Sequence, residues 1–294
     1  MLNGFRENTT DITRLRLTAR LEVSRHHADV SGDARGLEEL LDETRGLLGA
    51  TDPLAFRIEC ALEEMRSRDR STANSADVWE RLQQRACAYL PPHDQTLMRI
   101  RSFEAQYIRR RGEDGDVDRG ITLYRQELER RARLKGEFAY PTSMTRGNLA
   151  YALLARGRPA DLREAREILE QEVAHRTTAY GPESDFTGLA RGNLGRTLLR
   201  LHESGPRNSG GEEDDLPTRA LAIADSLKTS RGRRFGRRNN ATLSAHLLRA
   251  HALLLLGLID EARTEIRYVR AFVTNRGISI ERSWYNELCR RLEA

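Results

Sequence analysis

Cysteine is scarce in this sequence. Cys60, Cys87 and Cys289 are odd in number, widely separated and embedded in segments with helical periodicity. Disulfide frameworks and metal sites need cysteines in pairs or at short, regular spacings, and neither pattern occurs. We therefore expect three reduced thiols buried inside helices, in a protein of a reducing compartment.

Sequence patterns typical of catalytic and metal sites are also missing. No Gly-rich phosphate loop follows a strand, and neither G-x-S-x-G nor H-E-x-x-H occurs. The histidines do not replace them, because the adjacent His26 and His27 diverge on a helix and His246 and His251 lie five positions apart on different faces. The sequence therefore predicts a non-enzymatic protein with no cofactor and no metal.

Long apolar runs are absent as well. The longest, 252–259, is interrupted by Gly257 and is far shorter than the ~20 residues that span a bilayer. Residues 1–13 contain no apolar stretch of the kind that a secretory signal requires. No alternation typical of strands recurs, so we expect an all-α protein without membrane contact, located in the cytoplasm.

A repeat is the main feature that the sequence does contain. The tetrapeptide Arg-Gly-Asn-Leu occurs at Arg146–Leu149 and again at Arg191–Leu194, 45 residues later. The same step superimposes Thr142 on Thr187 and Lys135-Gly136 on Tyr180-Gly181. A period of this length is typical of stacked helical hairpins, which predicts a solenoid.

The repeat extends along the whole chain. A third copy follows at a longer step and places Thr242 on Thr187, and the added residues fall in 204–215, a segment rich in Gly, Ser, Pro and acids that predicts a solvated loop. We expect one domain over 1–294, with a capping helix at 279–292 that covers the last apolar face. The hairpin units are expected at about 11–49, 53–90, 95–136, 141–181, 186–236 and 240–276.

The segment Tyr180–Gly195 resembles a known repeat family. It reads YGPESDFTGLARGNLG and is similar to the tetratricopeptide (TPR) repeats of the kinesin light chain type, L-G-P-x-H-P-x-T-L-x-x-x-N-N-L-A. Ser184-Asp185 replace the family's His-Pro, and Gly192 replaces the first Asn of its pair. The resemblance, clear from about 92 to 274, implies an all-α, right-handed superhelical solenoid of about six TPR-like helical hairpins plus a C-terminal capping helix. It also implies a protein-interaction role, with the first helix of each hairpin lining a concave groove.

Helical geometry then predicts the binding face. If Leu149 and Leu153 pack against the partner helix, Asn148 and Tyr151 lie on the adjacent stripe, which the resemblance places in the groove. An amide there would bind the backbone of an extended peptide, and the arginines of the next unit would hold a carboxylate in bidentate geometry. The predicted partner-binding residues are Asn148, Tyr151, Asn193, Arg196, Arg200 and His251. The expected partner is a protein or peptide, and an acidic one.

Several of these residues also have a structural interpretation. Asn148 and Asn193 would tie one hairpin to the next if their side chains bond to backbone groups. His251 fits a packed side chain as well as a ligand contact. Gly147 and Gly192 indicate a close approach in mid-helix, either by a ligand or by the neighbouring helix.

Charge favours two further hypotheses. The net charge is +5, and arginines cluster at 109–111, 130–133 and 231–238, which is compatible with nucleic-acid binding through loops. The third cluster could instead pair with the acids at 212–215, and all three could be solvated helix ends. The other hypothesis is a peptide-responsive regulator that acts through a partner protein. Only Lys135 and Lys228 are lysines, an arginine bias that indicates a GC-rich coding background and a bacterial source of the actinobacterial type.

Overall fold

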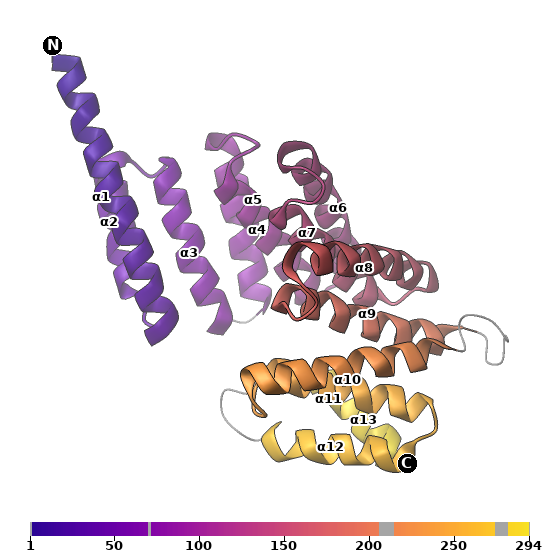
Figure 1. Cartoon of the computed structure of the whole chain (residues 1–294). Helices are drawn as coiled ribbons and strands as arrows, with labels where there is room; N and C mark the ends of the chain where they lie inside the picture. Colours follow the sequence, from indigo (N-terminus) through magenta and orange to yellow (C-terminus); the bar gives the residue numbers. More distant parts are fainter. Residues whose placement is uncertain (1, 70–71, 206–214, 274–281, 294) are drawn as a thin grey trace. The chain divides into compact units, whose positions relative to one another are not determined.

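The chain is all-helical in the parts described by the computed structural model, residues 2–69, 72–205, 215–273 and 282–293 (Figure 1). This confirms the fold class predicted from the sequence. The thirteen helices in those ranges are α1 (Leu2–Ser31), α2 (Arg35–Leu48), α3 (Pro53–Asp69), α4 (Thr72–Tyr89), α5 (Gln95–Arg111), α6 (Asp116–Lys135), α7 (Tyr140–Arg156), α8 (Pro159–Tyr180), α9 (Asp185–Ser204), α10 (Leu216–Phe235), α11 (Asn240–Leu255), α12 (Ile259–Val273) and α13 (Arg282–Glu293).

The helices form two compact units, Met1–Glu137 and Phe138–Ala294. In the first unit α3 contacts α5 as well as its neighbours α2 and α4, and in the second α7 contacts α9, which in turn contacts α11. Packing of each first helix on the first helix of the next hairpin is the arrangement of a helical-repeat stack. A single continuous array over both units stays a prediction, as do the unit boundaries given above.

Local sequence explains where the helices end. Asp94 precedes α5 and accepts hydrogen bonds from the backbone N–H groups of Thr96 and Leu97, which have no partner inside the helix. Gly112 and Gly157 follow α5 and α7 with φ of 85° and 74°, the left-handed conformation that glycine adopts without strain.

The repeated threonine of the TPR-like segment has a local role. The Thr187 hydroxyl donates to the carbonyl oxygen of Gly181 at 2.8 Å, and that of Thr242 donates to Gly236 at 2.9 Å. In both cases the glycine ends the previous helix, so the threonine fixes the turn between two hairpins by satisfying a carbonyl that no helix bond reaches. This explains why the threonine lies six positions after the glycine.

A bidentate ion pair closes two of the hairpins. Arg111 at the end of α5 holds Asp116 at the start of α6 through two bonds of 2.9 and 2.8 Å. Arg156 and Asp161 repeat the arrangement at the next step of the repeat, with both bonds at 2.6 Å. Hydrogen bonds from these arginines lower the pKa of both aspartates.

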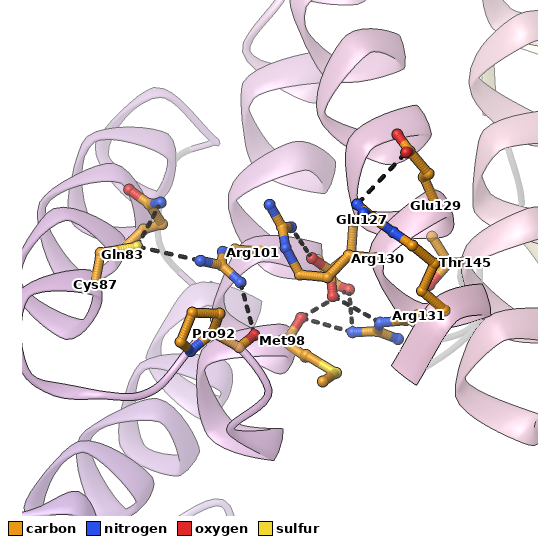
Figure 2. A network of polar contacts seen from close by, with 12 residues as sticks. Gln83, Cys87, Pro92, Met98, Arg101, Glu127, Glu129, Arg130, Arg131 and Thr145 are labelled. Carbon is orange, nitrogen blue, oxygen red and sulfur yellow. Dashed lines mark hydrogen bonds and ion pairs between the residues drawn. The ribbon is translucent and has the colours of Figure 1, made fainter. Parts of the chain in front are cut away.

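The cysteines differ from expectation. Cys60 is buried in the core of the first unit, where burial raises its pKa to about 12. Cys87 is exposed and Cys289 is half-buried, so the prediction of three buried thiols is wrong for both. The Sγ of Cys87 accepts from Gln83 and Arg101 (Figure 2). Helical periodicity shows that a residue is on a helix, but it does not give the width of the buried face.

A close helix crossing in the first unit requires a glycine. A Cβ on Gly120 of α6 would lie 2.8 Å from the Cβ of Arg109 and 3.1 Å from the carbonyl oxygen of Ala105, both on α5. We expect Gly120→Ala to lower the free energy of unfolding of this unit by about 1–2 kcal/mol, because overpacking outweighs the helix propensity that alanine gains. Denaturant unfolding followed by the fluorescence of Trp79 measures it. Gly46→Ala is the control, since nothing lies within 4 Å of its Cβ position, and the prediction fails if both variants gain stability.

Candidate functional site

The predicted stripe lies on the first helices of the second unit. Asn148 and Tyr151 are on α7 and Asn193 and Arg196 on α9, and all four are half-buried beside fully buried leucines. The guanidinium carbon of Arg196 lies 5.8 Å from the centroid of the Tyr151 ring, so the stripe is continuous from α7 to α9. Stacking on an aromatic face fixes the orientation of the guanidinium.

The two asparagines do not tie the hairpins together. Neither Asn148 nor Asn193 uses its side-chain amide in a hydrogen bond with any residue in the described ranges. Each amide can donate two hydrogen bonds and accept two, so both retain their full bonding capacity on the stripe. The structural interpretation of these residues therefore has no support in the contacts.

Recurring bonds between the helices are made by arginines instead, and the sequence analysis missed them. Arg131, Arg176 and Arg231 recur at the same steps as the repeat itself, the second step being the longer one. Their Nη2 groups donate to the carbonyl oxygens of Met98, Ser143 and Gly188, at 2.6, 2.9 and 2.9 Å (Figure 2 shows the first). The accepting residues are also evenly spaced at the step of the repeat, so the three units contain equivalent bonds. The spacing of the arginines was a signal in the sequence that these three positions are equivalent, although it did not show what they bind.

The same arginines extend to the next hairpin in the second unit. Nη1 of Arg176 donates to the carbonyl oxygen of Phe186 on α9 at 3.0 Å, and Nη1 of Arg231 donates to that of Ala241 on α11 at 3.1 Å. Each guanidinium thus bridges two consecutive first helices. The side chain of Arg176 is only 3% exposed, and its Nε bonds to Glu172 at 2.8 Å.

These bridges explain Gly147 and Arg146. A Cβ on Gly147 would lie 3.3 Å from Nη2 of Arg176, so the close approach there comes from the neighbouring helix and not from a ligand. A Cβ on Gly192 would lie 3.8 Å from Nη2 of Arg231, an ordinary contact distance, so no close approach requires glycine at that position. Arg146 is buried and pairs with Glu172 of α8 at 2.6 Å, as expected for a residue between helices.

An open pocket of about 580 Å³ lies where α9, α11 and α13 meet. Arg196, Arg200 and His251 of the predicted set line it, together with Trp284 and Arg291 of α13. Trp284 stacks on Arg196, with 4.5 Å between the guanidinium carbon and the ring centroid. The side chain of Arg200 is 54% exposed at the pocket edge, so this guanidinium is open to solvent.

His251 is buried in the wall of this pocket and is 4% exposed. Its Nδ1 accepts from the indole N–H of Trp284 at 3.3 Å, and its Nε2 lies 3.0 Å from Glu203. Arg291 donates to the same Glu203 oxygen at 2.5 Å. Burial raises the pKa of Glu203, but the hydrogen bonds from His251 and Arg291 dominate and lower it to about 2. Glu203 is therefore held as a carboxylate by these two partners, and Arg200, 3.9 Å from it, is an exposed cation at the pocket edge, as is Arg290 of α13.

The third arginine cluster is divided by the structure. Arg231 lies near the end of α10, which continues to Phe235, so the turn expected there begins later than predicted. Arg233, Arg234, Arg237 and Arg238 are exposed, and Arg234 lies 3.2 Å from Asp185. The acids Glu212, Glu213 and Asp214, expected as possible partners, lie outside the described residues.

The other two clusters are largely paired. Arg111 contacts Asp77, Glu113 and Asp116, and Arg130 and Arg131 both bond to Glu127 (Figure 2). Arg133 pairs with Glu129 on the surface of α6. Several of these arginines are therefore paired inside the chain, which reduces the positive surface of the clusters at 109–111 and 130–133, although Arg130 and Arg131 share one carboxylate.

Two further observations concern site chemistry. In the described part of the chain, no three His, Cys, Asp or Glu side chains are grouped so that they could hold a metal ion. None of the helices within those same ranges is long and apolar enough to cross a membrane.

Comparison with solved structures gives the fold. A putative kinesin light chain from Podosopora anserina with nearly identical TPR-like repeats matches with a TM-score of 0.56 at 17% identity, over 78% of this chain and 99% of that one. A point variant of that protein matches with a TM-score of 0.56 at 16% identity, over 74% and 93%. BtubC (BKLC) from P. vanneervenii matches with a TM-score of 0.50 at 15% identity, over 88% of each chain. No family model and no curated protein matches the sequence. The fold of this chain is that of the TPR-like helical-repeat proteins.

Proposed function

We propose that this chain binds an acidic segment of a partner protein along the stripe of Asn148, Tyr151, Asn193, Arg196 and Arg200. TPR-like repeat folds are generally protein-interaction modules and typically non-catalytic scaffolds, which gives the class of function. One observation carries the proposal. The side-chain amides of Asn148 and Asn193 have no hydrogen-bond partner in the described ranges, and the exposed Arg200 lies on the same stripe at the edge of an open pocket.

The chemistry of the stripe fits this partner. Amides bind the N–H and C=O groups of a peptide backbone without regard to its side chains, and the arginine forks add selectivity for carboxylates. His251 would support the site by holding Trp284 and Glu203 in place, rather than by direct contact. The bacterial source and the cytoplasmic location stay predictions from the sequence.

We expect Asn193→Ala/Arg196→Ala to weaken the binding of acidic peptides by about 10-fold to 100-fold, since each charge-assisted hydrogen bond lost costs about 1.5–3 kcal/mol. Peptides would be selected on the wild-type protein from a random library and their affinities measured by fluorescence anisotropy. Arg233→Ala/Arg237→Ala is the matched control, because it removes two exposed arginines away from the stripe. Selection of non-acidic peptides, or equal binding by both variants, would contradict the proposal.

Nucleic-acid binding is the second candidate, and it rests on the exposed Arg233, Arg234, Arg237 and Arg238. It predicts the opposite result with the same two variants, namely that Arg233→Ala/Arg237→Ala weakens binding of a DNA or RNA duplex. It also predicts a steep loss of affinity with salt, because released counterions drive the association. A regulator that acts through a partner protein would use the stripe itself, and would show a ligand-dependent change in a second binding reaction.

A further inference from the structure

The first helix carries an apolar face that no described residue of its own unit covers. Leu17, Leu21 and Ala28 of α1 are buried against α2 and α3, which pack on one side of it (Figure 1). On the other side Leu15 is 71% exposed and Val30 is 75% exposed. The exposed residues of this outer face are Ile12, Leu15, Ala19, Val23, His26 and Val30. The solvent-exposed side of a helix is expected to be polar, so this apolar face needs an explanation.

The outer face follows a regular repeat of eleven positions. This step leads from Ile12 to Val23, and equally from Leu15 to His26 and from Ala19 to Val30. Such a repeat makes three turns at about 3.67 residues per turn, close to the 3.6 of a straight helix. The face therefore runs almost parallel to the helix axis for about 27 Å, given a rise of about 1.5 Å per residue. This regularity is typical of a helix that pairs with another long helix.

The charged residues on the two flanks of the outer face indicate which long helix pairs with α1. Asp11 and Glu22 lie on one flank of the apolar face, and Arg16 and His27 lie on the other, with the same step of the repeat on each side. When two identical helices pack in parallel, the flank of one meets the opposite flank of the other, and a residue faces the one five positions further on. Asp11 then faces Arg16 of the second copy as an ion pair, and Glu22 faces its His27, which can donate a hydrogen bond to the carboxylate. An antiparallel pair would place acid against acid.

The flanking charges are accessible for such contacts. The side chain of Arg16 is 59% exposed and that of Glu22 is 56% exposed, although they also pair with Glu43 and Arg57 of the same chain. Asp11 and His27 are exposed. Replacing such an exposed pair within one chain by a pair between two copies costs little, because each pair contributes about 0–1 kcal/mol.

We propose that the outer face of α1 is an interface between two copies of this chain, which pair with their α1 helices parallel and in register. The apolar contact is small and includes one alanine and one histidine per copy, so the association is reversible and depends on concentration. The partner is chosen by the self-complementary flanks, and the pairing does not depend on what the stripe of the second unit binds.

The first test is the oligomeric state of the full chain by sedimentation velocity at concentrations from about 1 to about 200 µM, a range that brackets a micromolar dissociation constant. We expect a monomer–dimer equilibrium for the wild type and only monomer for Leu15→Glu/Val23→Glu, with the same circular dichroism because both side chains are exposed. If that variant fails to fold, Val30→Lys replaces it with the same expectation. A wild type that is monomeric throughout, or a dimer that persists in the folded variants, overturns the proposal.

The second test addresses the charges and the direction of pairing. Arg16→Glu should weaken the dimer at least several-fold, and Asp11→Arg/Arg16→Glu should restore it, since the exchange keeps opposite charges opposite. In a Cys87→Ser/Cys289→Ser background, Ile12→Cys should form a disulfide with its own counterpart, and Arg14→Cys should not, because Arg14 is directed to Asp52 of its own chain. Cross-linking that appears only between Ile12→Cys and Val30→Cys proteins would show antiparallel helices and overturn the parallel arrangement.

Discussion

Replacement of Arg176 by methionine should lower the free energy of unfolding of the second unit by about 3–5 kcal/mol. The guanidinium is 3% exposed and bonds to Glu172, to Ser143 on α7 and to the carbonyl oxygen of Phe186 on α9. Methionine fills similar volume but leaves a buried carboxylate short of one partner, and it removes the donor from two buried oxygens of Ser143 and from the part-buried carbonyl oxygen of Phe186. Because the bridge joins consecutive hairpins, we expect α7 and α9 to separate at lower denaturant.

The measurement is denaturant unfolding followed by the fluorescence of Trp284 in a Trp79→Phe background, so that only the second unit contributes. Arg234→Met is the control, because it lies in the same unit and the side chains of Arg234 and Asp185 are 56% and 49% exposed, and such a pair contributes about 0–1 kcal/mol. The double variant Arg176→Met/Glu172→Leu should recover part of the loss, since it removes the unpaired carboxylate. A loss below about 1 kcal/mol for Arg176→Met would show that the arginine bridge does not stabilise the stack.

Replacement of Glu104 by leucine should raise the free energy of unfolding of the first unit by about 2–3 kcal/mol at pH 8. Glu104 is 4% exposed and its Oε2 has no hydrogen-bond partner within the described ranges. At the steps of the repeat it corresponds to Leu149 and Leu194, both buried core residues, so leucine suits the position. Glu104 thus places a carboxyl group where the equivalent Leu149 and Leu194 place methyl groups.

The effect of Glu104→Leu should depend on pH. The pKa of Glu104 is raised from its usual 4.5 to about 7, mainly by burial. The nearby Glu80 contributes to the increase in pKa, and Arg119 and Arg101 oppose it. A carboxyl whose pKa is raised in the folded state favours folding when it is protonated. The contribution of Glu104 to wild-type stability is therefore fully present below about pH 4.5, and about 3 kcal/mol of stability is lost as the pH rises to about 7.

Unfolding with and without Glu104→Leu in a Trp284→Phe background, followed by Trp79 fluorescence between pH 4.5 and pH 8, measures the stability difference and its pH dependence. The two proteins should be closest in stability at pH 4.5 and should diverge as pH rises. Glu129→Leu on the surface of α6 is the control and should follow the wild type at every pH, because its carboxylate is exposed. Parallel stability curves for wild type and Glu104→Leu would show that Glu104 does not titrate in this range.

The sequence predicted the helical repeat because the repeat is a local property. Equivalent residues, such as Thr187 and Thr242, make the same bond to a glycine that lies six positions before them, so their spacing in the chain carries the geometry. The positions of Asn148 and Asn193 follow in the same way. The buried leucines show which side of each helix faces the core, and the helical period then places the asparagines on the adjacent stripe. Whether those residues bind a partner stays a prediction.

Residues whose role depends on distant contacts could not be assigned in this way. Arg176 and Arg231 are arginines in an arginine-rich chain, and their spacing does not distinguish a buried bridge from a solvated charge. Asn148 and Asn193 had two interpretations until the structure showed that the arginines, and not the amides, join the hairpins. The packing of Trp284 on Arg196 likewise depends on where α13 lies.

The sequence by itself determined which residues occupy equivalent positions, where helices start and end, and which face of each helix is apolar, because bonds within a few residues decide these features. Only the tertiary structure decided which polar residues are buried and what neutralises them. The pair of Glu203 and Arg291 joins residues 88 positions apart, and the bond from Arg231 to Gly188 spans 43. Such contacts form only when separate helices pack, and no periodicity in the chain encodes the distance between them.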